Sequence, residues 1–185
     1  MRIFGVILAG GEGRRMGGAD KALLPLGGVS MIARVRARLE PQVEALAISA
    51  NGDPARFRGT VLPDDDPQGP LSGVLAGLRW AAGLGADAVV TAPVDVPFLP
   101  GDLVPMLCLR WPGAALARAG GRLHPACALW PVTAAPSLEA WLASGQRRVG
   151  DFAASIGATP VDFPDPREFL NLNTPEDLAA AQALL

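Results

Sequence analysis

The chain has 185 residues, a length that suits one domain, which we expect to span residues 1–185. Half of the residues are hydrophobic and 18% are charged, so we expect a buried core and exclude a disordered chain. A net charge of −2 argues against nucleic acid binding, and no apolar run is long enough for a signal peptide or a membrane span. We therefore expect a cytoplasmic protein that binds neither nucleic acid nor membrane.

Short apolar strands alternate with amphipathic helices through the N-terminal half of the chain. The first strand candidate, residues 3–8, is rich in Ile, Val and Leu and runs into a glycine-rich loop, residues 9–20. One helix is predicted to begin after Ser30, which can cap it, and another after Gly69-Pro70. The further strand candidates are residues 43–50, 60–62 and 88–92. This alternation is typical of a parallel sheet with helices on both faces, where ligands bind at the carboxyl ends of the strands.

The C-terminal half has a different pattern. Residues 114–119 and 123–130 flank Gly120-Gly121, which predicts a hairpin and hence a mixed sheet. Thr174 is expected to cap a final helix with Pro175 in its first turn. The elements predicted between them are helices at residues 136–144 and 148–156 and a strand at residues 159–163. The fold class that follows is α/β: a three-layer, doubly wound, mostly parallel sheet with an antiparallel extension.

The glycine-rich loop has the composition of a polyphosphate-binding loop. Glycines let backbone N–H groups surround phosphate oxygens, and Arg14, Arg15 and Lys21 add positive charge at the same end of the sheet. Lys21 is the single lysine of a chain with fifteen arginines, which indicates a specific need for a compact ammonium group there. Two familiar motifs are excluded, because Ala22 stands where a P-loop has Ser or Thr and Met16 where a dinucleotide fingerprint has its third glycine.

A series of motifs resembles the signature of nucleotidyltransferases that activate sugars, alditols and molybdopterin. The first is Leu8-Ala9-Gly10-Gly11 followed by Asp20-Lys21, and its Ala-Gly-Gly form resembles the guanylyltransferases that attach GMP to molybdopterin. The motifs that follow in the family order are Ile48-Ser49-Ala50-Asn51, Asp64, Gly69-Pro70-Leu71-Ser72-Gly73, Ala92-Pro93-Val94-Asp95-Val96-Pro97, His124-Pro125, Arg147-Arg148-Val149 and Asn171-Leu172-Asn173-Thr174-Pro175-Glu176-Asp177-Leu178. The resemblance covers essentially the whole chain. It implies a fold like that of nucleotide-diphospho-sugar transferases, with residues 1–100 binding the nucleotide and residues 101–185 the acceptor.

By this resemblance the protein transfers GMP from GTP to molybdopterin or the molybdenum cofactor, releases pyrophosphate, and uses Mg2+ as cofactor. The catalytic residues it implies are Lys21 and Asp95, the first to neutralise charge on the leaving pyrophosphate and the second to hold Mg2+ on the GTP phosphates. The nucleotide-binding residues it implies are Leu8, Ala9, Gly10, Gly11, Lys21, Ser49, Asp64 and Asp95. Two choices stay open, because Asn51 can take the role of Ser49, and Asp65 or Asp66 that of Asp64.

The acceptor side of the site is expected near the end of the chain. Asn171 and Asn173 face the molybdopterin in the resemblance, and their side chains share one side if residues 169–173 are extended. His124 is interpreted as structural or adjacent to the substrate. Cys108 and Cys127 have no zinc-binding spacing and are expected to be buried thiols. Transient contact with proteins that deliver the cofactor, or that act as molybdoenzyme chaperones, is a further expectation.

Two alternative functions remain open. The first is a cytidylyltransferase for molybdopterin, or a sugar-phosphate nucleotidyltransferase, with the same fold and another substrate. The second is a non-catalytic regulatory module that binds GTP without releasing pyrophosphate. The presence of both Lys21 and Asp95 argues against the regulatory module, since binding alone does not require the pair.

Overall fold

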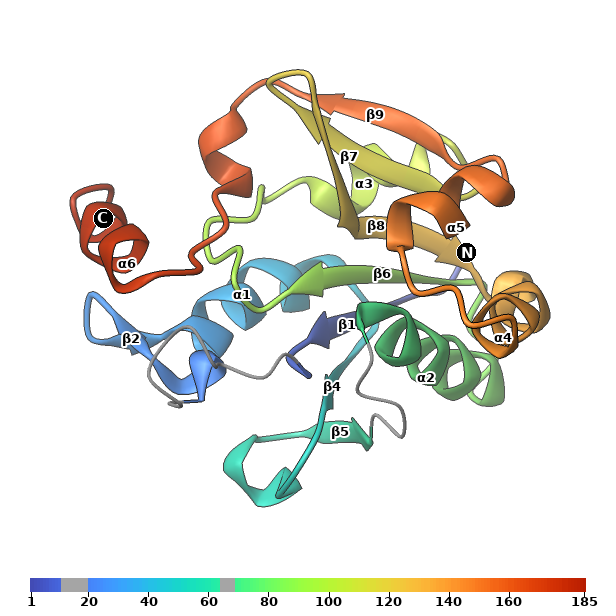
Figure 1. Cartoon of the computed structure of the whole chain (residues 1–185), viewed down its shortest axis with the longest axis horizontal. Helices are drawn as coiled ribbons and strands as arrows, with labels where there is room; N and C mark the ends of the chain where they lie inside the picture. The colour runs from blue at the N-terminus through green and yellow to red at the C-terminus, as the bar shows by residue number, and fades with distance from the viewer. Residues whose placement is uncertain (11–19, 64–68) are drawn as a thin grey trace.

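The computed structural model describes residues 1–10, 20–63 and 69–185 (Figure 1). These residues contain a seven-stranded sheet with the strand order β5-β4-β1-β6-β8-β7-β9. Its strands are β1 (Ile3–Leu8), β4 (Ala45–Ala50), β5 (Thr60–Pro63), β6 (Ala88–Pro93), β7 (Ala115–Ala119), β8 (Arg122–Pro131) and β9 (Thr159–Phe163). The strands β5, β4, β1 and β6 are parallel, β8 runs antiparallel to β6 and β7, and β9 is parallel to β7. The predicted mixed sheet is confirmed, and both halves of the chain contribute strands to it.

Helices cover both faces of the sheet, so the fold has three layers. The helices whose buried residues belong to the core on one face are α1 (Met31–Leu39), α3 (Leu103–Cys108) and α6 (Pro175–Gln182). Those on the other face are α2 (Pro70–Gly83), α4 (Ala135–Ala143) and α5 (Val149–Ser155). Figure 1 shows α1 and α2 on either side of the central strands β1 and β6. The predicted doubly wound arrangement is confirmed. Within the part of the chain that the structure describes, no helix is long and apolar enough to cross a membrane.

The central strand β1 is buried on both sides. Ile3 and Ile7 belong to the core beneath α1, whereas Phe4, Val6 and Leu8 belong to the core beneath α2. The two sets alternate because successive side chains of a strand point to opposite faces. A parallel strand between two helical layers therefore needs a continuous apolar run, which is the pattern that residues 3–8 show.

Helix α2 lies directly on the strands that carry the nucleotide motifs. A Cβ atom on Gly77 would come within 2.7 Å of Val6 Cγ2, and one on Gly73 within 2.6 Å of Ser49 Oγ. Neither position can accept a side chain unless the helix or the strand moves. The glycine at position 73 thereby brings the first turns of α2 against the carboxyl ends of β1 and β4.

Some local features differ from the predictions. Helix α3 and a small hairpin of β2 (Pro25–Leu26) and β3 (Val29–Ser30) were not predicted, because each is too short to show a hydrophobic period. Ser30 precedes α1, but its side chain makes no capping hydrogen bond; the Met31 N–H donates to the Leu24 carbonyl at 2.9 Å. The predicted cap at Thr174 is confirmed, and Asp177 completes a capping box with it.

Candidate active site

Four predicted nucleotide residues, Leu8, Ala9, Gly10 and Ser49, lie at the carboxyl ends of β1 and β4. Leu8 ends β1, and its carbonyl accepts a hydrogen bond of 3.0 Å from the Val94 N–H. The Ala9 N–H donates to the Ser49 carbonyl at 2.8 Å. Hydrogen bonds to neighbouring strands thus fix the backbone of Leu8 and Ala9, just before Gly10. Two predicted contacts, Gly11 and Asp64, lie outside the described residues.

Ser49 and Asn51 take different positions at the end of β4. The Ser49 side chain is 1% exposed, and its hydroxyl packs against Gly73 of α2. Asn51 lies in the turn after the strand, and its backbone carbonyl accepts a hydrogen bond from the Arg56 guanidinium. The choice between Ser49 and Asn51 as a nucleotide contact stays a prediction.

Three predicted site residues from distant parts of the chain meet in one cluster. The Lys21 ammonium donates to Asp95 Oδ2 at 2.9 Å and to Asn173 Oδ1 at 2.7 Å. The Lys21 and Asp95 side chains are only 15% and 19% exposed, so water screens their ion pair incompletely. This cluster joins both predicted catalytic residues to a predicted acceptor-binding residue.

Local hydrogen bonds hold the two partners of Lys21. Asp95 follows β6, and its backbone carbonyl accepts from the Leu172 N–H at 2.9 Å. Asn173 precedes α6, where its N–H and that of Thr174 each donate to Asp177 Oδ2 at 2.9 Å. The capping box of α6 therefore also fixes the backbone that carries Asn173.

Arg56 is a residue of this neighbourhood to which no sequence motif points. Lys21 begins a 3-10 turn (Lys21–Leu23), which Asp20 caps by accepting from the Ala22 N–H at 3.1 Å. The Arg56 guanidinium pairs with the Asp20 carboxylate and lies 4.7 Å from the centre of the Phe57 ring. Arg56 thereby connects the turn after β4 to the turn that positions Lys21. In the sequence it resembles any other of the fifteen arginines.

The acidic side chain of the cluster is suited to a hard cation. Asp95 Oδ1 is buried without a hydrogen-bond partner, while Oδ2 receives Lys21. Mg2+ takes carboxylate oxygens as ligands, commonly one or two together with substrate phosphates. Within the described ranges, no group of three or more His, Cys, Asp or Glu side chains comes together. Asp95 Oδ1 therefore fits as a ligand of a Mg2+ ion that also binds the phosphates of a nucleotide.

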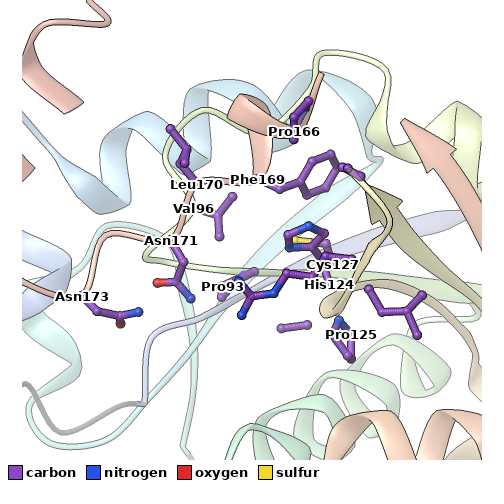
Figure 2. A pocket seen from close by; sticks show the side chains of 15 residues that line it. Pro93, Val96, His124, Pro125, Cys127, Pro166, Phe169, Leu170, Asn171 and Asn173 are labelled. Atoms are coloured by element: carbon purple, nitrogen blue, oxygen red, sulfur yellow. The ribbon is translucent and has the colours of Figure 1, made fainter. Parts of the chain in front are cut away.

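A cavity of about 520 Å³ lies beside this cluster (Figure 2). Its lining comes from three segments: Pro93 and Val96 after β6, the β7-β8 hairpin, and residues 166–173. Asn171 and Asn173 both line it (Figure 2), although Phe169 ends a 3-10 turn (Pro166–Phe169) and residues 169–173 are not all extended as assumed. Asn173 belongs both to this cavity and to the Lys21 cluster, so the cavity adjoins the predicted catalytic residues.

Strand β8 is irregular where it lines the cavity. Leu116 of β7 pairs with Ala128, but the next residue, Ala117, pairs with His124. Residues 125–127 therefore have no partner in β7 and form a bulge. Such a bulge accommodates Pro125, which could not donate a hydrogen bond within a regular ladder.

Two buried side chains hold the bulge from behind. The Thr91 hydroxyl donates to the Ala126 carbonyl at 2.9 Å, and the Trp130 indole N–H donates to the Thr91 hydroxyl at 3.0 Å. Thr91 and Trp130 are both 0% exposed. The carbonyl that the bulge removes from the β7 ladder is thus satisfied by a side chain of β6.

His124 and Cys127 are the titratable residues of β8 in the cavity wall. Burial, together with the nearby Arg122 guanidinium, lowers the pKa of His124 against an opposing hydrogen bond to the Ala119 backbone, so the neutral imidazole is favoured. Burial and the charge of Asp95 raise the pKa of the Cys127 thiol far above its usual range, which makes this thiol unreactive. The expectation of buried thiols is confirmed for Cys127, whereas Cys108 is only half-buried.

The fold is that of the nucleotidyltransferases. The chain belongs to the family of the MobA-like NTP transferase domain, whose model matches residues 5–158. It is 67% identical to a molybdenum cofactor guanylyltransferase of Cereibacter sphaeroides over 100% of this chain and 98% of that protein. A molybdenum cofactor guanylyltransferase of Rhodobacter capsulatus is 54% identical over 98% of this chain and 96% of its own length.

Solved structures share the fold of nucleotide-diphospho-sugar transferases with this chain. The crystal structure of molybdopterin-guanine dinucleotide biosynthesis protein A from Archaeoglobus fulgidus has a TM-score of 0.78 at 23% identity, covering 98% of this chain and 97% of that one. The 4-diphosphocytidyl-2C-methyl-D-erythritol synthase from Anaerococcus prevotii has a TM-score of 0.77 at 13% identity, with 99% and 95% covered. At these identities, the likeness shows the fold alone.

Proposed function

We propose that this protein transfers GMP from GTP to molybdopterin or the molybdenum cofactor, releasing pyrophosphate and forming the guanine dinucleotide cofactor. The observation that supports this proposal is the cluster of Lys21, Asp95 and Asn173, of which Asn173 also lines the cavity. In this proposal the residues implied for phosphate chemistry are neighbours of the space that takes the acceptor. The names of the close relatives support guanylyl transfer among the nucleotidyl transfers that this fold performs.

The chemistry is an in-line displacement at the α-phosphorus of GTP. An oxygen of the acceptor phosphate forms the new bond to the α-phosphorus, while the bond from that phosphorus to the β-phosphate oxygen breaks and pyrophosphate leaves. Catalysis in such a transfer is mainly positioning and electrostatic stabilisation. The Lys21 ammonium has three protons, of which two are donated to Asp95 and Asn173, and the third is left for a phosphate oxygen.

Asp95 holds the cofactor in this proposal. Mg2+, when bound through Asp95 Oδ1 and the GTP phosphates, would offset their negative charge. The backbone of Leu8, Ala9 and Gly10 would face the guanine side, as the family resemblance implies. Residues 1–100 thus serve the nucleotide and residues 101–185 the acceptor, with Asn171 on the cavity wall. A cytoplasmic location and transient contact with proteins that deliver the cofactor complete the proposal and follow from the resemblance alone.

Pyrophosphate release tests this function directly. The assay contains Mg2+ and each of the four nucleoside triphosphates in turn, with and without molybdopterin as acceptor. Release with GTP and acceptor alone is the expected result. Release with CTP instead would make the protein a cytidylyltransferase, and binding of GTP without release of pyrophosphate would favour the regulatory module.

A further inference from the structure

We propose that the part of the cavity remote from Lys21 is a subsite for a flat, fused nitrogen heterocycle, which stacks on His124 and presents its polar edge to Arg122. The inference rests on the proposed function, in which the acceptor carries a phosphate at one end and a pterin ring at the other. It assigns the ring to two particular side chains: Arg122, to which no family motif points, and His124, whose motif left it structural or adjacent to the substrate.

The first observation is an aromatic platform in the cavity wall. The His124 ring stacks on Phe169 with the ring centres 4.8 Å apart and the planes 29° from parallel. Phe169 is 2% exposed, whereas His124 is half-buried and lines the cavity (Figure 2). Phe169 covers one face of the imidazole, and the remaining face can receive a ligand ring.

The orientation of this platform is held by the hairpin that carries it. His124 pairs with Ala117 of β7 and its ring packs on Phe169, while the bulge at residues 125–127 sets the direction of the strand beyond it. The buried Thr91 hydroxyl in turn holds the bulge through the Ala126 carbonyl. A platform held from several sides loses little conformational entropy when a ligand stacks on it.

The second observation is the guanidinium of Arg122, which lies next to the platform. Over the residues that the structure describes, Arg122 makes no hydrogen bond or ion pair, although it is exposed and lines the cavity. Arg122 lies two positions before His124 on β8, and both residues line the cavity. Arg118, on the adjacent strand, is instead committed to Asp162 through two hydrogen bonds of 2.6 Å. The planar fork of a free arginine matches a ring nitrogen beside a carbonyl oxygen, as on the edge of guanine.

The third observation is that the platform and the Lys21 cluster border the same cavity. Asn173, which accepts a hydrogen bond from Lys21, and His124 both line it. A phosphate at Lys21 and a ring on His124 can therefore belong to one molecule. The volume of about 520 Å³ is in the range of small-molecule sites.

Direct binding of the acceptor in the absence of GTP tests this subsite. Molybdopterin is titrated into the wild-type protein, His124→Ala and His124→Phe, and the quenching of pterin fluorescence is followed. We expect Kd to rise about tenfold in His124→Ala, the loss typical of a stacking partner, and to stay within about twofold in His124→Phe. Arg79→Ala is the control, because Arg79 lies on α2 and pairs with Glu139 outside the cavity lining. Unchanged GTP binding and melting temperature show that each variant is folded.

Variants of Arg122 separate the effect of its positive charge from that of the planar guanidinium shape. Arg122→Ala and Arg122→Lys are both expected to bind molybdopterin about tenfold more weakly, since lysine keeps the charge but lacks the fork. Full affinity in Arg122→Lys would overturn the recognition of a ring edge. Wild-type affinity in His124→Ala, or equal weakening in His124→Ala and His124→Phe, would overturn the platform. Failure of the proposed function is seen separately, as tight molybdopterin binding by the wild-type protein without pyrophosphate release from GTP.

Discussion

The two halves of the sheet form their parts of the site in different ways. In the parallel half, β1, β4 and β6 end at one edge, and the site begins where these strands stop. In the antiparallel half, the cavity is walled by the side of β8, at a bulge that departs from the ladder. A parallel sheet places all of its strand ends together by its topology alone, whereas a bulge depends on a few specific buried contacts.

This difference separates the effects that substitutions should have. Changes at the parallel edge should lower the rate of phosphate transfer and leave the cavity intact. Changes at the bulge should weaken acceptor binding and leave the nucleotide site intact. The cluster of Lys21, Asp95 and Asn173 lies between the two halves and should be the most sensitive point.

The largest effect is expected for Lys21→Ala. Removal of a preorganised charge from a transition state typically lowers kcat by about 10²–10³-fold, and Lys21 is the ammonium that this site offers to the leaving pyrophosphate. The measurement is single-turnover pyrophosphate release with saturating GTP and acceptor. Lys21→Arg is the matched control, which keeps the charge and should retain part of the rate. Normal turnover in Lys21→Ala would contradict the catalytic role.

Thr91→Val should weaken acceptor binding without affecting nucleotide binding. The isosteric valine leaves the Ala126 carbonyl and the Trp130 indole without their buried partner. A buried group that loses its hydrogen bond costs about 1–3 kcal/mol, so the free energy of unfolding in urea should fall by an amount in that range. Acceptor binding should weaken several-fold while GTP binding is kept. Thr91→Ser, which keeps the hydroxyl, is the control, and an equal loss of acceptor binding in both variants would argue against the role of the hydrogen bond.

Arg56→Ala should affect the nucleotide half more mildly. Without the guanidinium, Asp20 loses its partner and the turn that carries Lys21 is less firmly held. We expect kcat to fall by about tenfold, in line with the effect of a group that orients a catalytic residue. Steady-state kinetics measure this, with Arg58→Ala as a nearby control. A raised KM for GTP at unchanged kcat would instead point to direct contact between Arg56 and the nucleotide.

The smallest effect concerns acid stability at the junction with α6. Hydrogen bonds from the backbone of Asn173 and Thr174 lower the pKa of Asp177 below 3.8. The ionised carboxylate therefore stabilises the folded state above its unfolded pKa, and this contribution is lost as the pH falls through the folded value. The melting temperature should drop less for Asp177→Asn than for the wild type between about pH 5 and about pH 3. An equal drop in the melting temperature of the two proteins over this pH range would refute the stabilising role of the ionised Asp177.

Much of the fold follows from short-range patterns in the sequence. Continuous apolar runs and helical periods located the strands of the sheet and five of the six α-helices in the described residues, because each element buries its own apolar face. The glycine pair at Gly120-Gly121 predicted the hairpin for an equally local reason. Short elements such as α3 were not predicted, because six residues cannot display a helical period.

The sequence by itself determined the class of the protein and predicted the residue types of its chemistry: a glycine-rich loop followed by the single lysine, a carboxylate after a buried strand, and a pair of asparagines before a capped helix. Only the tertiary structure decided that Lys21 contacts Asp95 and Asn173, which are 74 and 152 positions away. It also decided the roles of Thr91 and Arg56, which look ordinary in the chain. Their partners come from other strands and turns, and contacts of that kind leave no period or spacing in a sequence because packing alone brings them together.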